Sequence, residues 1–152
     1  MELPSPTCLL YSYIKAPISE YEKPPILWHP STLLVGLYVA HYVNRALISP
    51  LRTQSRSRSH AIIPLIAGFF NILNGFLIGS WLSSGVVNSH GWQHWHFWAG
   101  IALFLGGFAG NVLHDEILIQ IRRNAVRKAA KSGQDEKPKY EIPRGFMYRF
   151  IS

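Results

Sequence analysis

Residues 61–82 form an apolar run without a single charged side chain, and this run constrains the fold more than any other stretch. A helix needs roughly 17–25 mainly apolar residues to cross the hydrocarbon core of a bilayer. Asn71 and Asn74 share one face of such a helix. Gly68, Gly75 and Gly79 are small residues that let neighbouring helices approach closely. We therefore expect residues 61–82 to form a membrane-spanning helix that packs against others.

Two further apolar runs, residues 26–48 and 97–121, also have the length of membrane spans. The last run is expected to continue as a helix to about residue 128. Residues 3–14 are apolar but broken by Pro4 and Pro6, and they are too short to span a bilayer alone. The sequence predicts an all-α, polytopic membrane helical bundle with three full spans and a short N-terminal remnant, in a single membrane domain of residues 1–152.

The composition agrees with a membrane location. Only 15% of the residues are charged and 48% are hydrophobic, whereas soluble domains carry about 25% charged residues. The net charge of +7 would also suit a nucleic-acid-binding protein. However, the basic residues cluster directly after the apolar runs at Arg52, Arg56, Arg58, Arg122, Arg123, Arg127, Lys128 and Lys131. We therefore expect membrane lipids, and no nucleic acid, as partners.

These basic clusters also predict the topology. They follow residues 26–48 and residues 97–121, and the loop after residues 61–82 carries no Lys or Arg. If each run crosses once, both clusters lie on the same side of the membrane, and the positive-inside rule makes that side cytoplasmic. Residues 122–152 are therefore predicted to be a cytoplasmic basic tail.

The cysteine and histidine residues predict neither a disulfide nor a metal site. Cys8 stands alone, so no internal disulfide is expected. His90, His94 and His96 form a histidine-rich stretch of the kind found in membrane metal enzymes. The predicted topology places this stretch on the opposite side of the membrane from His60 and His114. We therefore expect no metal site.

Polar motifs lie in a characteristic order along and beside these runs. They are Glu2-Leu3-Pro4-Ser5, His41-Tyr42 followed by Arg45, Asn74-Gly75, Asn111 with Asp115, Arg122, and Tyr140-Glu141-Ile142-Pro143-Arg144-Gly145. With these motifs the chain resembles the steroid 5α-reductase family, which includes the very-long-chain enoyl-CoA reductases and polyprenol reductase. The resemblance covers nearly all of this chain. Members are seven-helix proteins of the endoplasmic reticulum that use NADPH to reduce a C=C bond conjugated to a carbonyl.

The resemblance also implies site residues. Tyr42 would donate its O–H to the carbonyl oxygen of the substrate, and Glu2 would orient Tyr42. The NADPH-binding residues would be Asn74, Asn111, Asp115, Arg122, Tyr140 and Arg144, with the arginines facing phosphates. The substrate would be a steroid or other lipid enone, in a multi-pass protein of the endoplasmic reticulum membrane. Relative to the family, the chain is expected to be a partial member that lacks the first helix and the C-terminal part.

Other interpretations of the same residues remain open. Tyr42 could be an ordinary helix aromatic and Glu2 a solvated terminus, while Asn111 and Asp115 could stabilise a helix end. We favour an interhelical hydrogen-bonding role for Asn71. For His41 we favour packing, or support of a neighbouring site residue, over a role as a base. The chain as a whole could be a truncated, catalytically silent relative. It could also be a membrane methyltransferase that uses S-adenosylmethionine.

Overall fold

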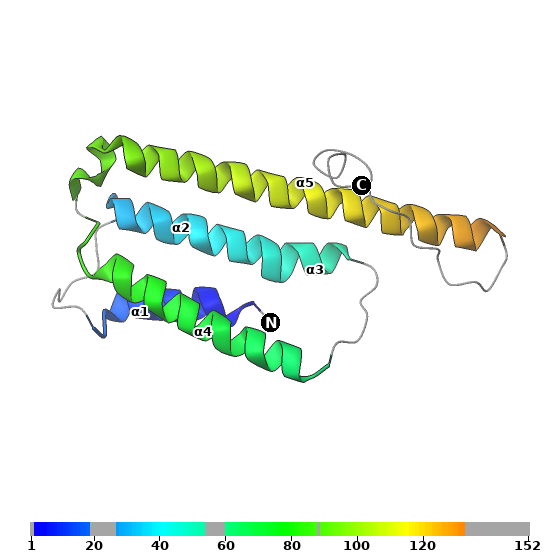
Figure 1. Ribbon diagram of the computed structural model, residues 1–152, viewed down its shortest axis with the longest axis horizontal. Coiled ribbons are helices and arrows are strands. Elements are labelled where there is room, and N and C mark those ends of the chain that lie inside the picture. Colours follow the sequence, from blue (N-terminus) through cyan, green and yellow to red (C-terminus); the bar gives the residue numbers. More distant parts are fainter. Residues whose placement is uncertain (1, 19–26, 54–59, 88, 133–152) are drawn as a thin grey trace. The chain divides into compact units, whose positions relative to one another are not determined.

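The computed structural model describes residues 2–18, 27–53, 60–87 and 89–132. Every element in these residues is helical, which confirms the prediction of an all-α chain (Figure 1). The elements are α1 (Pro4–Lys15), α2 (Pro30–Val43), the π-helical turn η1 (Asn44–Ile48), α3 (Ser49–Arg52), α4 (Ile62–Ser83), the 3₁₀ turn η2 (Ser89–Gln93) and α5 (Trp95–Ser132).

Two helices are long and apolar enough to cross a membrane. They are α4, Ile62–Ser83, with a mean hydropathy of 1.9, and the part Trp95–Lys128 of α5, with a mean hydropathy of 1.4. Both coincide with predicted spans. The predicted span over residues 26–48 corresponds to α2, which has 14 residues, and to the helical turns that continue it to Arg52. The number of three spans stays a prediction.

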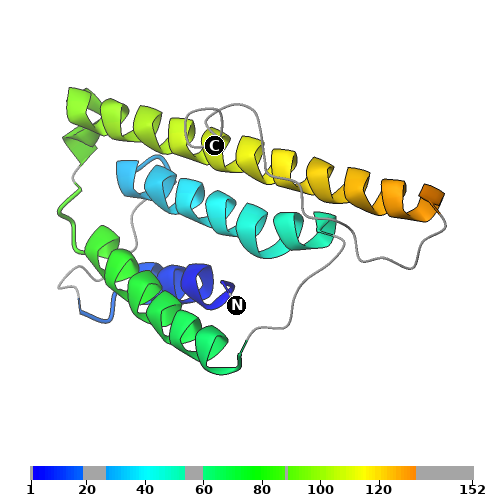
Figure 2. The same ribbon diagram turned by 45° about the vertical axis from the view of Figure 1, so that its right-hand side comes forward.

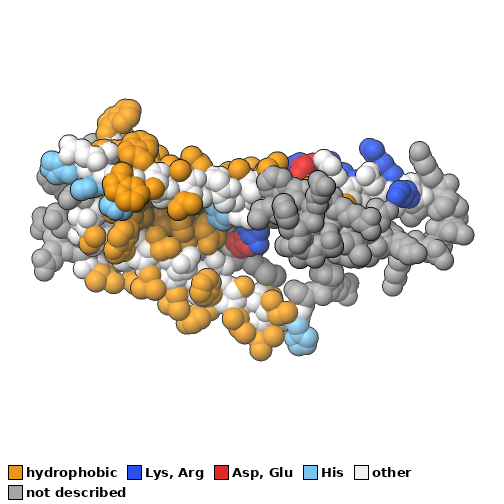
Figure 3. Space-filling model, turned by 45° about the horizontal axis from the view of Figure 1, so that its top comes forward, with side chains coloured by type: hydrophobic (Ala, Val, Ile, Leu, Met, Phe, Trp, Pro, Cys, Tyr) orange, Lys and Arg blue, Asp and Glu red, His pale blue; other side chains and the backbone are white. Residues whose placement is uncertain are grey.

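Large apolar side chains cover much of the described surface (Figure 3). On α4 the side chains of Leu65, Phe69 and Phe70 are 72%, 64% and 65% exposed. Extended apolar surface of this kind marks a contact with lipid or with other protein, because water solvates it poorly. The apolar faces of α4 therefore fit a membrane environment.

The turn η1 is a local widening of the helix that was not predicted from the sequence. Here the Ser49 backbone N–H donates to the carbonyl of Asn44, five residues back. Pro50 lies immediately after this turn. A proline in a helix has no N–H to donate, and its ring clashes with the carbonyl four residues earlier. The wider turn relieves that clash, so that the helix continues to Arg52 without a break.

Helix α1 packs closely against α4 through two glycines (Figure 2). A Cβ at Gly75 would overlap with the backbone carbonyl oxygen of Ser5, and a Cβ at Gly79 would lie 2.5 Å from that of Leu9. The predicted role of these glycines in close helix packing is confirmed. At Gly68 a Cβ would meet no described atom within 4 Å, so the role of this glycine stays a prediction.

Helix α1 is also joined to the start of α2. The Tyr13 hydroxyl lies 3.1 Å from Ser31 Oγ and 2.8 Å from Thr32 Oγ1. His29 precedes α2 and accepts from the Ser31 backbone N–H through Nδ1 at 3.3 Å. Apolar contacts among Leu9, Tyr13, Val35 and Leu82 accompany these hydrogen bonds. Helices α1, α2 and α4 therefore share one small core.

The chain divides into two compact units. One comprises Met1–Pro50 with Ser57–Ile101, and the other comprises Leu51–Arg56 with Ala102–Ser152. The packing of α1 against α2 and α4 lies in the first unit. In the second unit the Arg52 guanidinium forms an ion pair with Glu116, which also accepts from Gln120 Nε2 at 3.3 Å. The expectation of a single membrane domain stays a prediction.

Replacing Gly79 by alanine should destabilise the protein, whereas Gly68→Ala should not. The added methyl group at residue 79 meets the backbone of α1, which cannot rotate away, so we expect a loss of about 1–3 kcal/mol. The same change at Gly68 meets open space and should be neutral or stabilising by up to about 1 kcal/mol, because alanine favours a helix. Thermal unfolding of both variants in detergent measures the difference. Equal effects at the two positions would contradict the close packing.

Candidate active site

Tyr42 lies on the last turn of α2, one turn after Tyr38. The two rings are in contact, with centroids 4.6 Å apart and planes tilted by 30°. Residues four apart on a helix lie on the same face, so both phenol groups point to one side of α2. His41 contacts the Tyr42 ring edge-on, with centroids 5.4 Å apart, as expected of a packing residue. Tyr42 is therefore held by its neighbours on α2.

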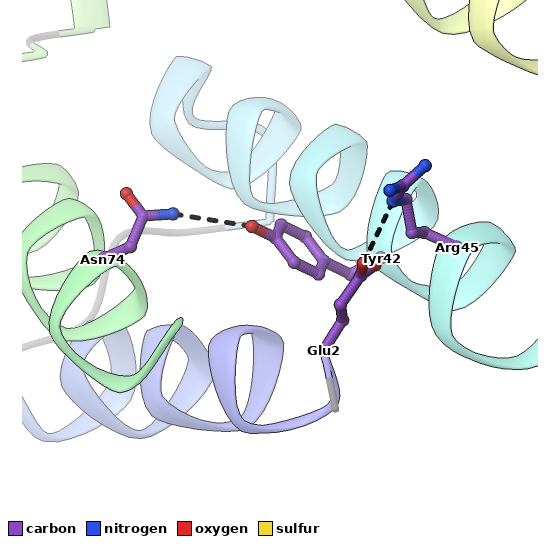
Figure 4. A network of polar contacts seen from close by, with 4 residues as sticks. All are labelled: Glu2, Tyr42, Arg45 and Asn74. Carbon is purple, nitrogen blue, oxygen red and sulfur yellow. Dashed lines mark hydrogen bonds and ion pairs between the residues drawn. The ribbon is translucent and has the colours of Figure 1, made fainter. Parts of the chain in front are cut away.

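Asn74 of α4 lies opposite the two tyrosines. Its Nδ2 donates to the Tyr38 hydroxyl at 2.9 Å. It also donates to the Tyr42 hydroxyl at 3.5 Å (Figure 4). The structure thus brings together Tyr42, predicted to be catalytic, and Asn74, predicted to bind the cofactor. Asn71, one turn earlier on α4, is buried. Of these two asparagines, Asn74 is the one whose side chain donates to the Tyr42 hydroxyl.

Glu2 lies just before α1 and pairs with Arg45 of η1. Arg45 Nε is 3.1 Å from Glu2 Oε1 (Figure 4). Glu2 was expected to orient Tyr42, but among the described residues its hydrogen-bond partner is Arg45. The two side chains are 31% and 52% exposed. Pairs this exposed stabilise a fold by about 0.2–1 kcal/mol, so this ion pair contributes little to stability.

The second carboxylate oxygen of Glu2 is buried and has no hydrogen-bond partner among the described residues. A buried acceptor in this state costs about 1–3 kcal/mol, and more when it is charged. A ligand that brings an N–H or O–H group would relieve this cost. Glu2 is therefore suited to accept a hydrogen bond from a bound molecule.

The remaining predicted residues lie on or beyond α5. Asn111, Asp115 and Arg122 follow one another at four- and seven-residue intervals, which places them on one face of the helix. Asn111 and Arg122 are exposed, and Asp115 is partly buried. All three belong to the second compact unit. Tyr140 and Arg144 lie outside the described residues.

The donor and acceptor types on this face fit a dinucleotide such as NADPH. A guanidinium binds phosphate through paired N–H groups, and a carboxylate accepts from ribose hydroxyls. An exposed amide such as Asn111 both donates and accepts. No group of three or more His, Cys, Asp or Glu residues that could hold a metal ion occurs in the described ranges.

Two features of the site were not predicted from the sequence. One is Tyr38, which shares the Asn74 amide with Tyr42; its position one turn before Tyr42 was the available signal. The other is the pairing of Glu2 with Arg45, which are 43 residues apart. The sequence showed their opposite charges, but no local spacing rule connects residues so distant along the chain.

Several known proteins are similar to this chain over most of its length. The rat protein 3-oxo-5-alpha-steroid 4-dehydrogenase 1 is 30% identical over 152 residues, covering 99% of this chain and 52% of the rat protein. The Gossypium hirsutum protein named Steroid 5-alpha-reductase DET2 is 30% identical over 128 residues, covering 80% of this chain and 45% of the plant protein. An uncharacterized Schizosaccharomyces pombe protein is 35% identical over 125 residues, 79% of this chain and 44% of its own length.

This chain therefore spans about half the length of these relatives. No solved structure matches it significantly. Residues 57–152 match the family described as 3-oxo-5-alpha-steroid 4-dehydrogenase. The match covers more than half of the chain, and the similarity to the rat protein extends over nearly all of it. The chain belongs to the 3-oxo-5α-steroid 4-dehydrogenase family, the steroid 5α-reductases.

Proposed function

We propose that this chain is part of an oxidoreductase that uses NADPH to reduce a C=C bond conjugated to a carbonyl in a steroid or other lipid. The observation that carries the proposal is the Tyr42 hydroxyl beside Asn74 Nδ2, at 3.5 Å, in a chain of this family. The names of the rat and plant relatives support a steroid as the substrate class.

Tyr42 supplies the donor that such a reduction needs. Negative charge develops on the carbonyl oxygen as the conjugated bond is reduced, and a fixed hydrogen-bond donor stabilises that charge strongly in a dry site. NADPH, when bound, supplies the hydride. The Tyr42 O–H donates to the carbonyl oxygen and lowers the barrier. Glu2, held by Arg45, accepts from the bound substrate or from a hydroxyl next to it.

The cofactor would be held by the polar face of α5. Arg122 would bind a phosphate, while Asn111 and Asp115 would bind ribose or amide groups. Tyr140 and Arg144 would add to this site. We place the protein in the endoplasmic reticulum membrane as a multi-pass protein. Its exposed apolar helix faces contact lipid, and its substrate enters from the same apolar phase.

Replacing Tyr42 by phenylalanine should abolish reduction and leave NADPH binding nearly intact. The change removes only the hydroxyl, so the rate of enone-dependent NADPH oxidation should fall at least about 100-fold, as for other lost oxyanion donors. Tyr11→Phe is the matched control, because the Tyr11 side chain is 61% exposed on α1. Reduction at the parental rate by Tyr42→Phe would rule out the assigned role.

Arg122→Ala should weaken NADPH binding by about 10- to 100-fold, the value of one charge-assisted hydrogen bond. Arg127→Ala serves as the control, because Arg127 is also exposed on α5 but lies on a different face. We expect less than about a twofold change for Arg127, since only distant charge is lost. Titration of tryptophan fluorescence with NADPH measures both. Equal losses of NADPH affinity in the two variants would show that the Arg122 face does not bind the phosphate. Binding of S-adenosylmethionine instead of NADPH would favour a methyltransferase.

Arg45→Leu should lower kcat/KM for the steroid about tenfold while changing the free energy of unfolding by less than about 1 kcal/mol. Without Arg45 the Glu2 carboxylate is no longer fixed, so substrate is positioned less well. In a Glu2→Gln background the same change should lower kcat/KM little further, because the carboxylate that pairs with Arg45 is already gone. Steady-state kinetics of the two single variants and the double variant give the answer. Independent, additive losses would show that Arg45 does not act through Glu2.

A further inference from the structure

The Tyr38 hydroxyl is the point at which three helices meet. It lies 2.5 Å from Ser5 Oγ of α1 and 2.9 Å from Asn74 Nδ2 of α4, while Tyr38 itself belongs to α2. Ser5 is fully buried. The proposed reduction, which uses only Tyr42 as the donor, gives Tyr38 no part. Its hydroxyl nevertheless makes shorter hydrogen bonds than the hydroxyl of Tyr42 does.

The amide nitrogen of Asn74 connects the two tyrosines. An asparagine side chain has two N–H groups on one nitrogen, so it can donate to two acceptors at once. The bond to Tyr38 is 2.9 Å and well formed, and the bond to Tyr42 is 3.5 Å and weak. The stronger contact fixes the orientation of the amide. Tyr38 thereby determines where the second N–H of Asn74 points.

We infer that Tyr38 is a positioning residue that acts on Tyr42 through Asn74. With its oxygen accepting from Asn74, Tyr42 directs its own hydrogen away from α4, toward a bound carbonyl. A hydroxyl that accepts a hydrogen bond also becomes a better donor, because hydrogen bonds in a chain polarise one another. This inference rests on the proposed function of Tyr42 as the donor to the substrate carbonyl.

The packing of α1 supports the same inference. Ser5 holds the Tyr38 hydroxyl from α1, and the Ser5 carbonyl oxygen lies against Gly75, the residue after Asn74. The close contact between α1 and α4 thus fixes both partners of Tyr38. The Tyr38 ring contacts the Tyr42 ring directly as well. Tyr38→Phe would keep that ring contact and remove only the hydrogen bonds, so the variant isolates the proposed role.

The test is a double-mutant cycle on the protein at its natural length in its membrane. Tyr38→Phe should lower kcat for enone reduction about tenfold, with KM for NADPH and for the steroid changed less than twofold. In an Asn74→Ala background the same change should not lower kcat further, because the hydrogen bonds that connect Tyr38 to Tyr42 are already absent. Tyr11→Phe is the matched control and should leave kcat unchanged. An unchanged kcat for Tyr38→Phe, or an equal loss in both backgrounds, would overturn the inference.

A second measurement does not depend on activity. With 3-fluorotyrosine in place of tyrosine, ¹⁹F NMR reports each hydroxyl environment, and Tyr→Phe variants assign the signals. Asn74→Ala should shift the Tyr38 and Tyr42 signals and leave the Tyr11 signal in place. If Tyr38 and Tyr42 do not respond, the shared amide is refuted. If the signals shift but Tyr42→Phe reduces enones normally, the proposed function fails while the connection from Tyr38 to Tyr42 stands.

Discussion

The site depends on the contact between the backbones of α1 and α4. With hydrogen atoms as their only side chains, Gly75 and Gly79 let α1 lie directly on α4, with the Ser5 carbonyl against Gly75. This contact fixes the start of α1, and with it Glu2 and Ser5. Glu2 then reaches Arg45, and Ser5 reaches Tyr38. The close packing at the glycines thus fixes the positions of polar groups a few residues away.

The polar groups of this site satisfy one another in an otherwise apolar setting. Ser5, Tyr38, Tyr42 and Asn74 are joined by hydrogen bonds between three helices. In a low-dielectric setting an unpaired polar group is costly, so mutual pairing also fixes the geometry. The exception is the buried oxygen of Glu2, which has no partner in the described ranges. The polar group that remains unsatisfied is thus the one best placed to receive a ligand.

The sequence predicted the helices better than it predicted the contacts between them. The uncharged run of residues 61–82 became α4, Ile62–Ser83, because length and apolarity alone define such a helix. The role of Gly75 and Gly79 was also foreseen, but Gly68 has no close neighbour among the described residues. Tyr42 and Asn74 were each identified through family motifs. The role of Tyr38 and the partner of Glu2 depend on how separate helices pack, which periodicity along one helix does not encode.

The π-helical turn at Asn44–Ile48 separates the part of the helix that carries Tyr42 from the part that carries Arg52. A turn of this kind holds one residue more than an α-helical turn, and each residue rotates the helix by about 100°. Losing a single residue here would swing the charged end of the helix around its axis and leave Tyr42 in place. Relatives that differ by one insertion or deletion at this turn would therefore carry Arg52 on a different face of the helix, while Tyr38 and Tyr42 keep their places.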